Sequence, residues 1–216
     1  RTFFTAAVVI ILYAFSAAPC FAEKIAFLAI DGNSYLIHKA IQGLDLPPRF
    51  ETAFFTHQDL LADESARAFV AESEVVLCEV MMSELSEHLI ENDLVRSKKV
   101  YALRGSRGYE GLKKQGFIFD PDITAYFDHL SVENIQNLIR RAVHTALDDT
   151  VEYGPLKMQL QVGLYHPDAP GPFKEYQAYR KWYASRPAFD ETRPWIGLTH
   201  FSSSLVEGQR DKVDEG

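Results

Sequence analysis

Cysteine is scarce in this sequence, and the scarcity excludes a disulfide framework. The 216 residues contain two cysteines, Cys20 and Cys78. Cys20 lies in an N-terminal segment that we expect to be removed, so Cys78 would remain without a second cysteine. Its surroundings, "EVVLCEVMM", are apolar. This pattern is typical of a buried thiol that packs as a small hydrophobic side chain, with a reactive thiol as the alternative.

Basic residues are also fewer than acidic residues. The chain has 22 Lys and Arg against 30 Asp and Glu, a net charge of −8, and the acids are spread along its whole length. No basic stripe is present that would neutralise a phosphate backbone. Nucleic acid is therefore not expected as a partner.

Long apolar runs are missing except at the N-terminus. The opening "RTFFTAAVVIILYAFSAAPCFAEK" combines one positive charge, an apolar run and small residues before Glu23, the layout of a secretory signal peptide. We expect residues 1–22 to be a signal peptide and the protein to be exported to the periplasm. If this segment is not a working signal, we expect the protein to stay in the cytoplasm. The apolar run is short for a bilayer span, so a retained anchor is the alternative, and no other membrane contact is expected.

The signature motifs of common enzymes are absent as well. "IDGNS", after the first expected strand, has one glycine and lacks both the dinucleotide pattern and the P-loop lysine. "LRGSRGYEG" at 103–111 places Arg104 and Arg107 among glycines, which fits a phosphate loop or a plain connection. No serine lies in a nucleophile elbow, and no histidines have zinc-peptidase spacing. Catalytic residues stay unknown, and no resident metal site is predicted.

What the sequence does contain is a regular alternation of strand-like and helix-like segments. Buried or alternating apolar runs predict strands at 24–30, 49–57, 74–80 and 98–105. Helical spacing of apolar residues predicts helices at 34–44, 63–73 and 83–94, and a longer helix within 127–147 that begins after Ser131, with Ser131 and Asn134 as a weakened capping box. Strands that alternate with helices predict an α/β fold with a doubly wound parallel sheet. The acids, Gly and Pro of "DDTVEYGP" place a boundary near residue 154.

A second α/β segment is expected after this boundary. It begins with a strand at 156–167, continues with a helix at 173–185 and ends with another strand near 193–204. The two strands share an ending, "GLYH" up to His166 and "GLTH" up to His200. Because ligands bind outside the carboxyl ends of parallel strands, both histidines and Asp168 are candidate binding residues at one rim. The alternative is that they only stabilise the strand ends.

Residues 160–210 resemble the large subunit of the CobN and magnesium-chelatase H family. The resemblance lies in "YHPDAP" at 165–170, the aromatic-rich "FKEYQAYRKWY" at 173–183 and "IGLTHFSSSLVEGQ" at 196–209. It implies a flavodoxin-like unit at 23–153, followed at 154–216 by the start of the chelatase-type domain. Family members are several times longer, so we expect a truncated chain that lacks most of the active site.

The resemblance also implies substrates and partners. It implies a tetrapyrrole, either a corrin or a porphyrin, a divalent metal such as Co, Mg or Fe, and ATP used only through ATPase partner subunits. This chain departs from the family pattern in two ways that affect these expectations. Many members have Arg-Ser-His where this chain has Ser202-Ser203-Ser204, which removes a cation and an imidazole and argues against direct ring contact at that turn. Export would also separate the chain from cytoplasmic ATPases and favour components of haem or corrin uptake as partners.

Two functions therefore follow from the sequence. The first is the tetrapyrrole-binding large subunit of a cobaltochelatase-like metal chelatase, which inserts a metal into the ring or removes one. The second is an exported module of flavodoxin-like fold that binds a small ligand without catalysis. In either case we expect His166 and Asp168 to stabilise the end of a strand rather than to perform chemistry. The metal, the ring, the direction of the reaction and the oligomeric state are not determined by the sequence.

Overall fold

The computed structural model describes residues 22–81, 83–104, 109–160, 162–187, 189–190 and 192. Residues 1–21 of the expected signal peptide lie outside the described residues, as do Arg107, His200 and Ser202–Ser204. The elements in chain order are β1 (Glu23–Leu28), the 3-10 turn η1 (Asp31–Asn33), α2 (Ser34–Gln42), β2 (Phe50–Phe55), α3 (His57–Ala62), α4 (Glu64–Glu72), β3 (Val75–Glu79), α5 (Ser83–Glu91), α6 (Leu94–Ser97), β4 (Lys99–Leu103), α7 (Tyr109–Gln115), α8 (Pro121–Asp128), α9 (Val132–Ala146) and α10 (Tyr176–Ala184).

The four strands form one parallel sheet in the order β2-β1-β3-β4. Phe27 in the central strand β1 pairs with Phe54 of β2 and Leu77 of β3. Beyond β4, a single parallel bridge joins Tyr101 to Ile118 and takes the place of a fifth strand. This is the order of a flavodoxin-like sheet. The α/β class predicted from the sequence is confirmed.

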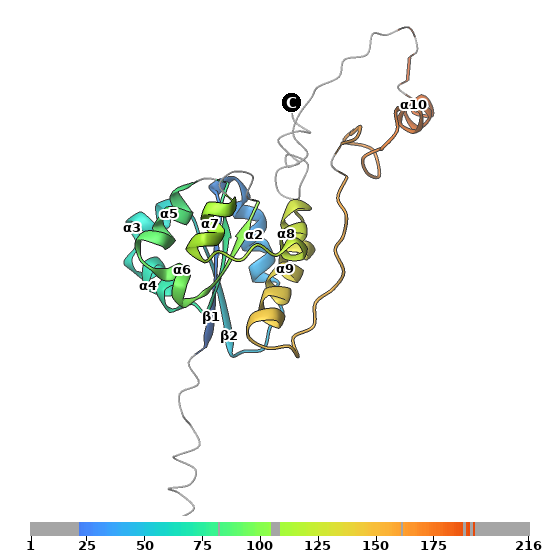
Figure 1. The fold of residues 1–216 in the computed structure, drawn as a ribbon. Helices are drawn as coiled ribbons and strands as arrows, with labels where there is room; N and C mark the ends of the chain where they lie inside the picture. Colours follow the sequence, from blue (N-terminus) through green and yellow to red (C-terminus); the bar gives the residue numbers. More distant parts are fainter. Residues whose placement is uncertain are drawn as a thin grey trace, which may run out of the picture.

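Helices cover both faces of the sheet, as Figure 1 shows. One core lies between the sheet and α2, α8 and α9, and includes Phe27, Phe127 and Leu138. The other lies between the sheet and α3, α4, α5 and α6, and includes Leu28 and Leu89. Strands covered on both faces read as continuous apolar runs. This explains why β1 and β3 were recognisable in the sequence without alternation.

The helix α9 connects the sheet to the residues that follow it. The Ser131 hydroxyl accepts the backbone N–H of Asn134 at 3.1 Å, as the predicted cap requires. The Asn134 side chain, however, binds groups other than the N–H of Ser131. Its amide donates to the carbonyls of His129 at 2.6 Å and Lys157 at 2.7 Å, and its oxygen accepts the Lys157 N–H at 3.0 Å. One buried amide therefore attaches the outgoing chain to α9.

We expect Asn134→Ala to lower the free energy of unfolding by about 2–3 kcal/mol, because three partly buried hydrogen bonds to the backbone of His129 and Lys157 are lost. Asn137→Ala is the matched control one turn further along α9. That residue holds the outgoing chain through a single 3.0 Å bond, from the N–H of Gly154, so its loss should be near 1 kcal/mol. Urea denaturation followed by circular dichroism measures both values. Equal losses would contradict the special role of Asn134.

The strand expected at 156–167 is wrong for the described part of that range. Residues 155–160 are not in a strand, and only the antiparallel bridge between Leu164 and Phe173 forms there. A strand needs a neighbouring strand, and the amides of Lys157 and Gln159 are instead bound by the side chains of Asn134 and His129. Met158 remains 72% exposed. The helix expected at 173–185 is present as α10, and the domain boundary near 154 stays a prediction.

Candidate functional site

The carboxyl edge of the sheet has one point where the chain turns in opposite directions. The strand β1 leads into α2 on one face, and its neighbour β3 leads into α5 on the other face. In open parallel sheets this switch point is the usual ligand position. Here the last residue of β3, Glu79, lies at that position.

The Glu79 carboxylate connects three loops at this edge. Its side chain is fully buried. The Oε2 atom accepts hydrogen bonds from the backbone N–H of Ile30 and from the Asn33 amide, both at 3.2 Å. The Oε1 atom lies 3.6 Å from a guanidinium nitrogen of Arg104 and has no hydrogen-bond donor among the described residues. Burial raises the pKa of the Glu79 carboxyl, while these three neighbours act to lower it.

Arg104 is held in an uncommon backbone conformation. Its φ of +50° is in the left-handed region, which costs a non-glycine residue about 1 kcal/mol or more. The guanidinium lies over the Phe127 ring at 4.9 Å and donates to the Phe127 carbonyl at 3.5 Å. It also lies 4.0 Å from Asp128. Arg104, which fitted either a phosphate loop or a plain connection in the sequence, is therefore turned toward Glu79 and α8.

The loop that carries His166 and Asp168 is closed by paired backbone hydrogen bonds. Leu164 and Phe173 exchange N–H and C=O bonds, each at 2.8 Å. Inside the loop, the N–H of Asp168 donates to Nδ1 of His166 at 3.2 Å. The Asp168 carboxylate forms an ion pair with Arg186 at 2.8 Å. The structure thus places these two predicted site residues together.

These contacts limit what His166 and Asp168 can do chemically. Because Nδ1 accepts a backbone N–H, the ring proton of neutral His166 lies on Nε2. Asp168 has its charge balanced by Arg186. Within the described residues, no group of three or more His, Cys, Asp or Glu side chains is arranged to hold a metal ion. A role of His166, Asp168 or His200 in ring binding stays a prediction.

We expect Gly163→Ala to open this loop. An added Cβ would lie 2.9 Å from the Phe173 carbonyl oxygen, which accepts the Leu164 N–H, and 2.5 Å from a Leu160 methyl group. Such overpacking costs about 1–3 kcal/mol, which corresponds to roughly 5- to 150-fold faster exchange of the Leu164 amide. Gly171→Ala is the control, because nothing lies within 4 Å of its Cβ. Protection of Leu164 that survives Gly163→Ala would contradict the close approach.

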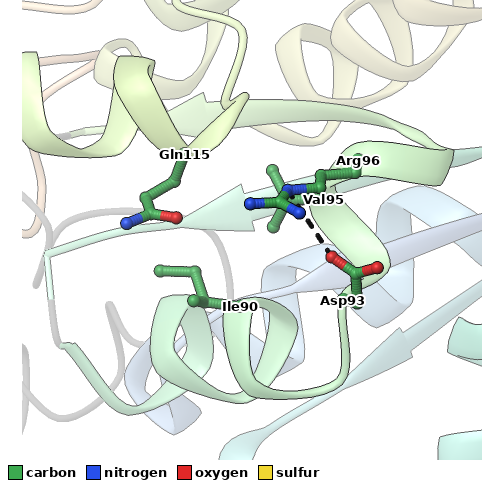
Figure 2. A pocket seen from close by; sticks show the side chains of 5 residues that line it. All are labelled: Ile90, Asp93, Val95, Arg96 and Gln115. Atoms are coloured by element: carbon green, nitrogen blue, oxygen red, sulfur yellow. Dashed lines mark ion pairs between the residues drawn. The ribbon is translucent and has the colours of Figure 1, made fainter.

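A small hollow lies at the opposite edge of the sheet, before the start of β4. Figure 2 shows its lining, which consists of Ile90, Asp93, Val95, Arg96 and Gln115. The ion pair between Asp93 and Arg96 spans 3.6 Å, and both side chains are 77% exposed. Exposed pairs of this kind contribute little to stability. The hollow contains none of the predicted site residues.

Cys78 was expected to be a buried thiol that packs as a hydrophobic side chain. Cys78 is fully buried in β3, and burial raises the pKa of its thiol well above the usual range, with the neighbouring Glu79 adding to the effect. The interpretation of Cys78 as a packed hydrophobic side chain is confirmed.

Among the helices in the described part of the chain, none has the length and apolar character needed to cross a bilayer.

Sequence reasoning missed Glu79, although a signal was present. The run "VVLCE" ends a fully buried strand with a carboxylate, and acids are almost never fully buried unless they are paired. The partners Ile30, Asn33 and Arg104 lie 25 to 49 positions away in the chain. The sequence alone does not bring them together.

Comparisons with known proteins agree with the resemblance found in the sequence. Residues 124–215 match the family described as CobN/Magnesium Chelatase. This segment begins within α8 and includes His166, Asp168, α10 and His200. The chain is also 29% identical over 86 residues to the H-type subunit of magnesium chelatase from Chlorobaculum parvum. Residues 124–215 are therefore similar to the CobN/magnesium-chelatase family.

The matches cover a small part of each longer relative. The alignment with the Chlorobaculum protein spans 39% of this chain and 7% of that protein. A solved structure, the catalytic subunit of cobaltochelatase from Mycobacterium tuberculosis, covers 69% of this chain and 12% of its own, with 13% identity and a TM-score of 0.46. The likeness to this family rests on the two sequence matches.

Proposed function

We propose that this chain is part of the large subunit of a metal chelatase that binds a tetrapyrrole and exchanges a divalent metal with it. The observation that carries the proposal is the match of residues 124–215 to the CobN/magnesium chelatase family. Within it, a cobaltochelatase-like activity on a corrin or porphyrin is the finer proposal. The ring and the metal are substrates, and any use of ATP belongs to partner ATPase subunits.

Chelation requires side chains that remove the pyrrole N–H protons while the metal enters the ring. In the described residues, His166 and Asp168 are engaged by the loop and by Arg186. We therefore assign them the role of holding the loop that leads into α10. His166→Ala should lower thermal stability more than turnover. An intact fold with abolished ring binding would contradict this assignment.

We also propose export to the periplasm, on the basis of the signal-like residues 1–22. An exported chain would bind, transfer or demetallate a ring together with haem or corrin uptake components. Cell fractionation with an antibody against the protein tests this point. A cytoplasmic protein of unprocessed size would overturn the proposed export and favour ATPase partners.

The test of the proposed function is an absorbance titration of the full-length protein with haem, metal-free protoporphyrin and a cobalt-free corrin, in the absence of ATP. A shift of the Soret or corrin band with one of these rings is expected, and the strongest shift identifies the preferred ring. No shift with any ring would overturn the proposal and favour a module that binds a small ligand without catalysis.

A further inference from the structure

The residues around α10 form a cluster of six aromatic rings, which we call the α10 aromatic cluster. Its members are His166, Phe173, Tyr179, Trp182, Tyr183 and Phe189. We propose that this cluster is the surface on which the planar face of the tetrapyrrole stacks, and that the lysines and arginines beside it bind the carboxylates of the ring. This inference rests on the proposed function.

The rings pack against one another rather than into a protein core. Trp182 lies 5.2 Å from His166 and 5.4 Å from Phe173, measured between ring centroids. No residue of α10 is buried. Between residues 162 and 187, Ala169 is the one buried hydrophobic residue of the described chain. The cluster therefore leaves aromatic surface that a flat ligand can cover.

The orientation of two tyrosines favours a planar ligand. Tyr179 and Tyr183 lie one helical turn apart, and their rings are within 5° of parallel, with centroids 5.9 Å apart. Aromatic rings prefer offset-stacked or edge-to-face arrangements, and both occur here. A tetrapyrrole offers an extended π-face, which suits such an arrangement better than a compact aliphatic ligand does.

The charge around the cluster favours an anion. The segment from 162 to 187 contains Lys174, Arg180, Lys181 and Arg186 against two acids, within a chain of net charge −8. One of the acids, Asp168, is already paired with Arg186. The Arg186 guanidinium lies 5.4 Å from the centre of the Trp182 ring and so brings cationic charge next to the aromatic face. A planar aromatic molecule with carboxylate side chains complements both features.

The loop contacts hold the cluster in place before any ligand binds. The paired hydrogen bonds between Leu164 and Phe173 position the Phe173 ring, and the ion pair of Asp168 with Arg186 joins the loop to the end of α10. Binding to groups that are already ordered loses less conformational entropy. Within the cluster, His166 supports the rings of Trp182 and Tyr183, at 5.2 and 5.5 Å between centroids, so His166 and Asp168 position the stacking rings rather than stack on the ligand themselves.

The first experiment tests stacking. Full-length protein carrying Trp182→Leu or Tyr183→Leu is titrated with metal-free protoporphyrin, and the Soret shift gives the Kd. We expect binding about tenfold weaker for each variant, because one aromatic contact to the ring is lost. Tyr35→Leu is the matched control, since Tyr35 is 52% exposed but lies on α2. It should bind as the unsubstituted protein does.

The second experiment tests charge with surface changes that leave the rings intact. Lys174→Glu combined with Lys181→Glu alters two exposed side chains. This variant should weaken binding of the free acid about tenfold and leave binding of the carboxylate-esterified porphyrin unchanged, because only the acid loses ionic contacts. Equal effects on acid and ester would contradict carboxylate recognition at this surface.

The outcomes separate the two proposals. If the unsubstituted full-length protein binds the porphyrin and both the leucine and the glutamate variants bind equally well, the α10 aromatic cluster is not the ring surface, and the proposed function stands. If the unsubstituted protein binds no tetrapyrrole, the proposed function itself fails. Circular dichroism of each variant identifies any loss of folding, and in that case the glutamate variant decides the question.

Discussion

Glu79→Ala should lower the free energy of unfolding by about 3 kcal/mol, one of the largest losses expected from a polar residue in this chain. The substitution removes the acceptor of the Ile30 N–H and the Asn33 amide, and it leaves Arg104 without its buried partner. Urea denaturation at neutral pH measures the loss. A loss below about 0.5 kcal/mol would contradict the view that this carboxylate connects the three loops.

Glu79→Gln is the matched variant, and pH distinguishes it from the unsubstituted chain. It should lose about 1 kcal/mol or less, because the amide oxygen still accepts from Ile30 and Asn33 and no charge is desolvated. Burial raises the pKa of the Glu79 carboxyl above its ordinary value of 4.5, so the native state holds this proton more tightly than the unfolded state. The stabilisation from Glu79 is therefore complete below pH 4.5 and is lost as pH rises through the raised pKa.

The stability of the unsubstituted chain relative to Glu79→Gln should consequently fall as pH rises from 4.5. Denaturation curves of both proteins over this range provide the measurement, and groups common to both cancel in the difference. A difference that increases with pH would mean that the ion pair with Arg104 outweighs burial and that the pKa is lowered instead.

Phe127→Ala should cost about 3–5 kcal/mol, the usual loss for a fully buried phenylalanine. The ring is fully buried, lies 6.0 Å from Phe27 in the core beside α8 and α9, and supports the Arg104 guanidinium at 4.9 Å. Phe127→Leu keeps most of the volume and should cost no more than about 1.5 kcal/mol. Thermal and urea unfolding distinguish the two variants, and similar losses would mean that the cavity is not the main cause.

A double-mutant cycle isolates the contact between this ring and Arg104. Arg104→Met should cost more in the unsubstituted chain than in Phe127→Leu, with a coupling energy of about 0.5–1 kcal/mol for a partly exposed cation over an aromatic ring. Additive losses would indicate that Arg104 acts at this edge through Glu79 alone. Either result assigns the energy of the carboxyl edge to a particular contact.

The strands and long helices of the first unit, residues 23–153, were predictable because the sequence patterns that indicate them are local. Continuous apolar runs predicted β1 and β3, and the apolar stripe of α9 predicted a long helix that begins after Ser131. The short helices α3, α7 and α8 were not predicted, since six to eight residues contain too few turns to show a period. Even so, the strand alternation was sufficient for the α/β class.

The second segment shows the limit of local signals. Residues 156–162 alternate between apolar and polar side chains as a strand does, yet the described residues there pair with no sheet. Alternation of apolar and polar residues indicates which face a strand would bury. Whether the strand forms depends on a neighbouring strand that pairs with its backbone N–H and C=O groups. The side chains of Asn134 and His129 bind that backbone instead.

The sequence by itself determined the fold class of the first unit and the likeness of the second segment to the chelatase family, because both depend on residues close together in the chain. Only the tertiary structure decided that Glu79 lies at the switch point with Ile30, Asn33 and Arg104, and that six aromatic rings gather around α10. These arrangements depend on the packing of distant segments, and the pattern of nearby residues does not encode which loops meet.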